Sequence, residues 1–259
     1  MKGFLSWLGG KSQLAPKISE HLKSINHTCY CEPFMGGAHV FFRKEPAKAE
    51  VLNDINRDLT TLFRVLQHHP DEFMRHFKWA ISSRDEFERL NKQNPDSLTD
   101  IQRASRFYYL QKLCFGGKAF ERSFGTSTTN APRLNLFRIE EELSQVHLRL
   151  ARVQIENLPW QKIITRYDRE HTLFYIDPPY FNCEAYYGKN IFERSEYREM
   201  ASILKVIKGN FILSLNDHEE IRKTFDGFHI QKVSVPYTLS SKGPPKKAPE
   251  LLISNVKLG

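Results

Sequence analysis

The part of this sequence best suited to chemistry is an apolar segment that ends in two prolines and a tyrosine. Residues 172–176 lead into Asp177, Pro178, Pro179 and Tyr180. Two successive prolines remove two N–H donors and hold the chain extended, so carbonyl groups point away from a strand ladder. These carbonyls and the Asp177 carboxylate suit a planar amino group that donates two hydrogen bonds, and the Tyr180 ring offers a base a stacking surface. A turn that merely closes a buried strand, capped by Asp177, would explain the same residues.

A glycine turn, residues 32–38 (EPFMGGA), follows another strand-like segment and precedes a helix. Small residues there let the backbone approach a cofactor, and the helix N-terminus offers unpaired N–H groups. Asp54 ends the next strand, 54 − 36 = 18 residues after Gly36, close to where nucleoside-binding folds place a ribose-binding acid. The spacing fits an adenosine group, although a plain turn and a helix-capping Asp54 would give the same pattern. The turn lacks GxGxxG, which disfavours a nicotinamide-linked oxidoreductase.

A second glycine pair lies near the start, in residues 7–12 (WLGGKS). Gly-Lys-Ser belongs to the phosphate-binding P-loop pattern, but position 5 is Leu where that pattern needs Gly, and no strand precedes it. Two interpretations remain. Either Ser12 caps a helix and Lys11 is solvated, or the Lys11 cation and the Trp7 ring lie over a small-molecule pocket.

Strand-like segments near residues 30, 51, 154, 174, 213, 231 and 253 predict a seven-stranded sheet. Helical apolar spacing predicts helices over 12–23, from 38, and over 56–67, 139–152 and 196–208. This alternation is typical of a doubly wound, mostly parallel α/β sheet, whose ligands bind beyond the carboxyl ends of the strands. The glycine turn at 32–38 lies at such a strand end.

Residues 69–134 differ from the rest of the chain. Their helical segments are rich in charged and aromatic residues, and they continue into Gly116, Gly117, Gly125 and a Ser/Thr run with hardly any strand signal. We therefore expect a mostly helical inserted subdomain, 69–134, within a catalytic domain formed by 1–68 and 135–259.

The composition is that of a soluble globular protein. The 259 residues include 40% hydrophobic and 26% charged residues, and 38 Lys+Arg against 30 Asp+Glu give a net charge of +8, which suits a polyanionic partner. No apolar run approaches the roughly 20 residues of a membrane span, and no signal peptide is evident, so we expect a cytoplasmic protein. The four cysteines lack CxxC spacing, and the pair His68–His69 has no ligand partners nearby, so neither a disulfide scaffold nor a metal site is expected.

Together these motifs resemble the Dam-type DNA adenine-N6 methyltransferases, and specifically phage- or prophage-like members. Residues 7–11 match the family's WxGGK, 32–38 its EPFxGxG, 53–56 its NDIN and 177–180 its DPPY. Residues 239–252 are similar to its serine, basic loop and final strand. The resemblance covers nearly the whole chain, with the motifs in the family's order.

The resemblance implies a Rossmann-like enzyme that moves a methyl group from S-adenosylmethionine to adenine N6 in double-stranded DNA. The adenine would be flipped out, stacked on Tyr180 and held between Asp177 and the Pro178 carbonyl; no metal or covalent intermediate is required, and we expect a monomer. The catalytic residues would be Asp177, Pro178, Pro179 and Tyr180. The cofactor-binding residues would be Trp7, Lys11, Phe34, Gly36, Asp54, Ile55 and Asp177. The DNA-binding residues would be Lys118, Ser240, Lys242, Lys246 and Lys247, and the inserted segment 69–134 would be the target-recognition subdomain.

The sequence departs from the family pattern in two places. Ala38 replaces a glycine of FxGxG, a change that we expect to be tolerated at a helix start. Gly116 replaces the Asn of an aromatic-Asn-Gly segment found in members that read GATC, so we expect relaxed or redirected base recognition. We also expect Asp177→Ala to spare the fold, because the turn should be exposed.

Two other functions fit parts of the pattern. A related methyltransferase could act on RNA or on a protein glutamine, but those enzymes usually have Asn at the position of Asp177 and lack the N-terminal GGK. A catalytically silent DNA-binding module would use the same basic surface without binding S-adenosylmethionine.

Overall fold

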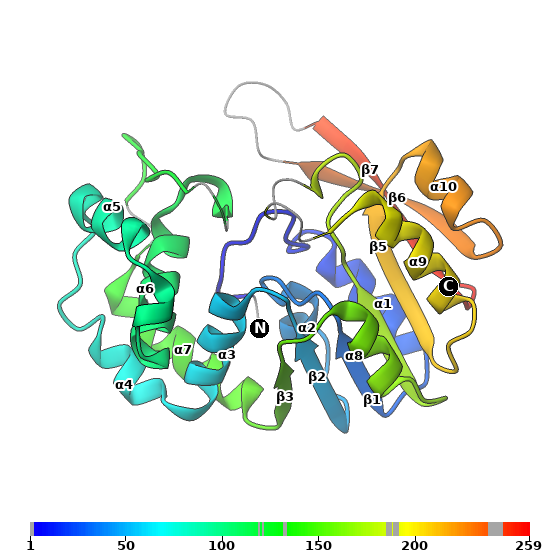
Figure 1. Ribbon diagram of the computed structural model, residues 1–259, viewed down its shortest axis with the longest axis horizontal. Coiled ribbons are helices and arrows are strands. Elements are labelled where there is room, and N and C mark those ends of the chain that lie inside the picture. Colours follow the sequence, from blue (N-terminus) through cyan, green and yellow to red (C-terminus); the bar gives the residue numbers. More distant parts are fainter. Residues whose placement is uncertain are drawn as a thin grey trace.

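A single mixed sheet forms the centre of the computed structural model (Figure 1). The structure describes residues 3–118, 120, 122–131, 134–184, 188, 192–237 and 246–259. At residues 137, 235–237 and 246–248 it describes the backbone alone. In the described chain seven strands follow the order β3-β2-β1-β4-β5-β7-β6. They are β1 (Cys29–Glu32), β2 (Ala49–Asn53), β3 (Val153–Glu156), β4 (Thr172–Ile176), β5 (Asn210–Asn216), β6 (His229–Tyr237) and β7 (Lys246–Ser254). The first five are parallel, and β7 runs antiparallel to both neighbours. The predicted mostly parallel seven-stranded sheet is therefore confirmed.

Alternating side chains of the central strands enter two separate apolar clusters, because successive residues of a strand point to opposite faces. Tyr30 and Leu52 belong to one cluster, and their neighbours Cys31 and Val51 belong to the other. The first cluster includes residues of α1 (Ala15–Ser24), α2 (His39–Arg43) and α3 (Arg57–His68), and the second includes residues of α8 (Trp160–Tyr167), α9 (Arg194–Leu204) and α10 (Glu219–Thr224). Helices on both faces make the sheet doubly wound. No helix among the described residues is long and apolar enough to cross a membrane.

A group of helices lies beyond β3 at one side of the sheet (Figure 1). It consists of α4 (Pro70–Arg75), α5 (Arg84–Lys92), α6 (Asp100–Leu113) and α7 (Leu136–Leu150), with short 3₁₀ turns η1 (Pro95–Ser97) and η2 (Phe115–Gly117). Their apolar side chains join the first cluster: the rings of Phe4 and Tyr108 stack at 6.3 Å, and Arg103 of α6 pairs with Asp58 of α3. The helices of 69–134 thus share a core with the sheet instead of forming their own. The domain boundaries themselves remain a prediction.

Two helix starts show how local sequence sets the ends of these elements. Asn56 Oδ1 accepts hydrogen bonds from the N–H groups of Asp58 and Leu59 at 3.0 and 3.3 Å. Asn56 thus caps α3, which begins at the next residue. By contrast, α1 begins at Ala15 after Leu14, whose side chain makes no cap, with a proline in the first turn. The interpretation that Ser12 caps this helix is wrong.

Candidate active site

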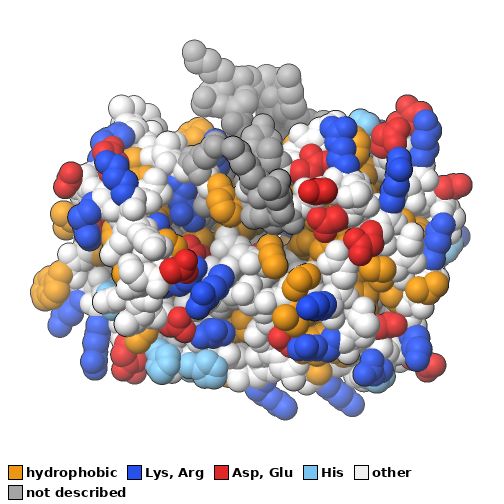
Figure 2. Space-filling model, in the orientation of Figure 1, with side chains coloured by type: hydrophobic (Ala, Val, Ile, Leu, Met, Phe, Trp, Pro, Cys, Tyr) orange, Lys and Arg blue, Asp and Glu red, His pale blue; other side chains and the backbone are white. Residues whose placement is uncertain are grey.

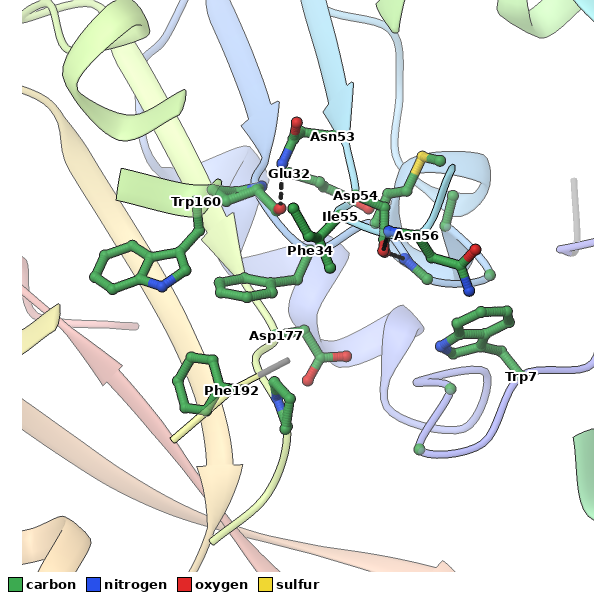
Figure 3. A pocket seen from close by; sticks show the side chains of 18 of the residues that line it. Trp7, Glu32, Phe34, Asn53, Asp54, Ile55, Asn56, Trp160, Asp177 and Phe192 are labelled. Carbon is green, nitrogen blue, oxygen red and sulfur yellow. Dashed lines mark hydrogen bonds between the residues drawn. The ribbon is translucent and has the colours of Figure 1, made fainter. Parts of the chain in front are cut away.

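One pocket of about 420 Å³ lies beyond the carboxyl ends of β1, β2 and β4, where the strand order reverses. Figure 3 shows Trp7 on one side of it, Trp160 and Phe192 on the other, and Asp177 between them. The structure brings together every residue predicted to bind a cofactor: Trp7, Lys11, Phe34, Gly36, Asp54, Ile55 and Asp177 all line this pocket. Three motifs that are far apart in the sequence therefore form one site.

The glycine turn and Asp54 fix each other. Gly36 has φ +46°, and a Cβ there would lie 2.8 Å from the indole of Trp7, so only glycine fits. The Gly36 N–H donates to Asp54 Oδ2 at 3.0 Å, and the Asn56 N–H donates to Oδ1 at 2.9 Å. Burial raises the pKa of Asp54 to about 6, although these N–H donors act in the opposite direction. The carboxylate is thus held at the end of β2, facing the pocket.

Ala38 adopts a left-handed conformation, with φ 50° and ψ 36°, immediately before α2. Glycine adopts this region freely, whereas a residue with a Cβ pays roughly 1–2 kcal/mol. The expected tolerance of the alanine stays a prediction, and the strain that opposes it lies in the backbone. It was not foreseeable from the added methyl group alone.

Lys11 is buried, and its ammonium group binds the Asp-Pro-Pro-Tyr turn. Its Nζ lies 2.7 Å from Asp177 Oδ1, donates to the Gly9 carbonyl at 2.9 Å, and lies 4.4 Å from the centre of the Tyr180 ring. The interpretation that Lys11 is solvated is therefore wrong, and the alternative, with Lys11 and Trp7 at a pocket, agrees with the structure.

Asp177 is much less exposed than expected. Its side chain is 19% exposed, and Oδ1 accepts a second hydrogen bond from Ser214 Oγ at 2.9 Å. Burial raises the pKa of Asp177, while the neighbouring Lys11 lowers it. The expectation that Asp177→Ala removes a side chain from an exposed turn is wrong, because the change would leave a buried cation without its carboxylate.

The other residues of this turn have separate places. Pro179 lines the pocket, and its carbonyl accepts a hydrogen bond from Tyr197 Oη of α9 at 2.9 Å. Pro178 and Tyr180 do not line it; the Tyr180 ring packs against the second apolar cluster. The turn is thus joined to helix α9 as well as to Lys11.

A buried acid that sequence reasoning left without a role also faces the pocket. Glu32 is 1% exposed and accepts a hydrogen bond from Tyr30 Oη at 2.6 Å, and Lys44 Nζ lies 4.2 Å from the centre of the Tyr30 ring. Burial raises the pKa of Glu32 to about 8. Its place at the end of β1, as the first residue of the glycine turn, was the available signal.

Sequence reasoning also missed an aromatic wall. The ring of Phe34 lies 6.3 Å from that of Trp160 and 5.9 Å from that of Phe192. Trp160 is fixed by its Nε1–H, which donates to Glu196 Oε2 at 2.6 Å. Trp160 could have been found, because it follows β3 at the same edge of the sheet; nothing in the sequence marked Phe192.

The inserted segment touches the N-terminal glycine turn. The Gly117 carbonyl accepts hydrogen bonds from the Leu8 N–H at 3.0 Å and from Gln111 Nε2 at 2.7 Å, and the same Nε2 donates to the Ser6 carbonyl at 2.7 Å. Gly117 has φ +69°, and a Cβ would lie 3.1 Å from the Ser6 backbone. Residues 115–118 are therefore fastened to the segment that carries Lys11.

Of the residues predicted to bind DNA, only Lys118 has a described side chain. Lys118 follows η2 and is half-buried outside the pocket lining. Lys246 and Lys247 lie in β7, paired with Tyr237 and Pro236 of β6, where only the backbone is described. Ser240 and Lys242 lie outside the described residues.

The family model for D12 class N6 adenine-specific DNA methyltransferases matches residues 7–239. That range includes both glycine turns, Asp54 and the Asp-Pro-Pro-Tyr turn. The chain belongs to this family. It is therefore a DNA adenine-N6 methyltransferase, and neither the RNA or protein-glutamine alternative nor the silent binding module is supported.

Individual relatives of the methyltransferase come from distant sources. The chain is 27% identical to the type II methyltransferase M.MjaIII of Methanocaldococcus jannaschii, over 98% of this chain and 99% of that protein. It is 25% identical to the type II methyltransferase M.CviBI of Paramecium bursaria Chlorella virus NC1A, over 88% of each. It is 23% identical to the DNA adenine methylase of Escherichia coli (strain K12), over 100% of this chain and 96% of that protein. The similarity thus extends along nearly the whole methyltransferase.

Proposed function

We propose that the pocket binds S-adenosylmethionine and that the turn at Asp177–Tyr180 receives an adenine rotated out of duplex DNA. The observation that carries this proposal is that Asp54 and Asp177 line the same pocket, one at the glycine turn and the other at the Asp-Pro-Pro-Tyr turn. A volume of about 420 Å³ lies within the usual range for small-molecule sites. The bound methyl donor and the target adenine would then lie next to each other in this pocket.

The pocket residues fit this cofactor. Asp54, a half-buried carboxylate, would accept hydrogen bonds from the ribose hydroxyls, and Phe34, Gly36 and Ile55 would lie along the nucleoside. Lys11 and Trp7 would close the methionine end. When bound, S-adenosylmethionine supplies an electrophilic methyl group on a sulfonium.

Asp177 would hold the amino group of the target adenine together with the Pro178 carbonyl. Lys11 and Ser214 both bind Oδ1, so Oδ2 is the atom we assign to the adenine. The amino lone pair of adenine is delocalised into the ring and is a poor nucleophile. Two acceptors on its N–H groups favour a more tetrahedral nitrogen whose lone pair points at the methyl group.

Tyr180 would stack on the flipped base, an interaction worth roughly 1–3 kcal/mol. Catalysis on this proposal is mainly alignment and electrostatic preorganisation, with Lys11 keeping Asp177 ionised and in place. It requires neither a metal nor a covalent intermediate.

DNA would be held chiefly through its phosphates. Figure 2 shows Lys and Arg side chains on both halves of one face, and the net charge is +8. We propose phosphate contacts from Lys118, Ser240, Lys242, Lys246 and Lys247, with little sequence read beyond the adenine. Such contacts position a duplex without carrying sequence information.

The test is methyl transfer from S-adenosylmethionine labelled in its methyl group to duplex DNA, followed by mapping of the modified adenines. Asp177→Asn keeps the side-chain volume beside Lys11 but replaces the anionic acceptor, so we expect activity to be lost. Asp226→Asn, at an exposed turn, is the matched control and should remain active. Labelling of an RNA duplex in preference to DNA, or full activity of the Asp177 variant, would contradict the proposal.

A further inference from the structure

Phe181, the residue after the Asp-Pro-Pro-Tyr turn, is held at both of its backbone groups by one side chain. Its N–H donates to Asn216 Oδ1 at 2.9 Å, and its carbonyl accepts from Asn216 Nδ2 at 3.1 Å. Asn216 is the last residue of β5, a strand whose interior is entirely buried. The pairing imitates one step of a β-ladder, made by a side chain instead of a strand.

A primary carboxamide makes this pair of bonds at any pH, because it carries both a donor and an acceptor. A carboxylate accepts but does not donate, and an apolar side chain does neither. Phe181 is also fixed by its ring, which lies 4.4 Å from His218 and 5.7 Å from Tyr197 and is 9% exposed. The backbone immediately after Tyr180 is therefore fixed in both position and direction.

The same strand holds the other end of the turn. Ser214 and Asn216 are two residues apart on β5 and point to the same side of the sheet. Ser214 Oγ donates to Asp177 Oδ1 at 2.9 Å, while Asn216 binds the residue after Tyr180. The two residues thereby set the spacing between the acceptor carboxylate and the stacking ring.

We propose that Asn216 is a positioning residue for the target adenine, acting by holding Tyr180 at a fixed place relative to Asp177. This inference rests on the proposed function, in which that turn receives the base. Asn216 touches neither the base nor the cofactor in this scheme. Its effect should therefore fall on the transfer step and leave cofactor affinity unchanged.

A second asparagine side chain, that of Asn53, holds backbone groups in the same way beside the proposed cofactor site. Asn53, at the end of β2, donates from Nδ2 to the Pro33 and Leu158 carbonyls at 2.8 and 3.0 Å and accepts from the Leu158 N–H at 2.9 Å (Figure 3). Pro33 and Leu158 line the pocket. Asn53 thus offers a comparison variant whose effect should be the reverse of that of Asn216.

The experiment compares Asn216→Asp, Asn216→Ala and Asn53→Asp, with Asn91→Asp on the exposed surface of α5 as the neutral control. Each purified protein is assayed for kcat and KM on duplex DNA, for the Kd of S-adenosylmethionine, and for fluorescence of 2-aminopurine at the target position. Both Asn216 variants should lose at least tenfold in kcat and lose the base-flipping signal, with the cofactor Kd within twofold of wild type. Asn53→Asp should instead raise that Kd at least tenfold.

Two results would overturn the inference while leaving the proposed function intact. In the first, the wild type is active and the Asn216 variants keep kcat within twofold of it. In the second, the Asn216 variants show a lower Tm, and their cofactor Kd and kcat worsen in parallel with it. If Asn216→Asp does not fold, Asn216→Ala decides, because it adds no charge. A wild-type protein that binds S-adenosylmethionine but never flips or methylates adenine would instead overturn the proposed function, and this inference with it.

Discussion

Lys11 Nζ and Asp177 Oδ1 lie 2.7 Å apart and join the N-terminal glycine turn to the Asp-Pro-Pro-Tyr turn. The lysine side chain is 4% exposed, so the carboxylate is the counter-ion of a buried cation. The ammonium also faces the Tyr180 ring. Three residues from two separate motifs therefore behave as one electrostatic unit.

Lys11→Met should make methyl transfer more sensitive to acid. Lys11 lowers the pKa of Asp177 against the raising effect of burial, so without it the carboxyl takes up a proton at higher pH. Activity should fall more at pH 6.5 than at pH 9, and the acidic limb of the kcat profile should move to higher pH. Single-turnover rates across pH measure this, with Lys17→Met on the exposed face of α1 as the control. A uniform loss at all pH values would argue against the electrostatic role.

Asp54→Asn should raise the Kd of S-adenosylmethionine by about 10- to 100-fold, because a charged acceptor contributes roughly 1.5–3 kcal/mol. The pKa of Asp54 is raised to about 6, so the wild-type carboxylate is ionised above that pH and progressively protonated below it. Wild-type affinity should therefore weaken as the pH falls through 6, and the variant should lack this dependence. Titration calorimetry at pH 5 and pH 7.5 checks both points; equal affinities would remove Asp54 from the site.

Ala38→Gly should stabilise the protein by about 0.5–1 kcal/mol, because glycine adopts the left-handed conformation without strain. The gain is smaller than the full strain energy, because glycine also makes the unfolded chain more flexible. For a chain of this size the expected rise in Tm is about 1–4 °C. Ala201→Gly, within α9, is the matched control and should lower stability by about 1 kcal/mol. Thermal denaturation of both variants gives the comparison, and a lower Tm for Ala38→Gly would show that its methyl packing outweighs the strain.

Gly116→Asn should leave stability nearly unchanged and narrow the choice of methylated sites. Gly116 has φ +71° with nothing within 4 Å of an added Cβ, and Asn is among the residues that best tolerate this conformation. Its amide can make bidentate contacts to adenine edges. Gly117→Asn, whose Cβ would crowd Ser6, should lower Tm instead. Mapping of methylated adenines in plasmid DNA measures which sequence contexts are modified. An unchanged set of contexts would show that residue 116 takes no part in base recognition.

Replacing Lys242, Lys246 and Lys247 by alanine should weaken binding to all duplexes alike. Each phosphate contact contributes about 0.9 to the slope of log affinity against log salt, so the slope should decrease by about 2–3. Binding measured from 50 to 300 mM salt tests this. The control replaces Lys205 and Lys208, near the amino end of β5 and away from the pocket, and should keep the wild-type slope.

The sheet was predictable because burial dictates its sequence. The fully buried β4 and the interior of β5 are short apolar runs, whereas the residues of β3 alternate between apolar and polar. The grouping of Gly36, Asp54 and Asp177 also followed from sequence, since parallel strands bring their carboxyl ends to one edge. The predicted strand order therefore already placed these separate motifs in one site.

The missing parts depend on contacts that no local pattern encodes. The burial of Lys11 depends on a carboxylate contributed by a different motif. The left-handed backbone of Ala38 arises from how β1 enters α2, and the role of Asn216 depends on a turn from another strand. Polar residues at the end of an apolar strand were the one sign available for Ser214 and Asn216.

The bonds from Gln111 to Ser6 and Gly117, and from Leu8 to Gly117, have a consequence for protein engineering. The inserted helices cannot be exchanged between relatives as an independent cassette, because one of their glutamines holds the N-terminal segment that leads to Lys11. A chimera would have to carry residues 3–12 and 69–134 from the same parent. The inserted helices and the segment that carries Lys11 are thus structurally coupled in this chain.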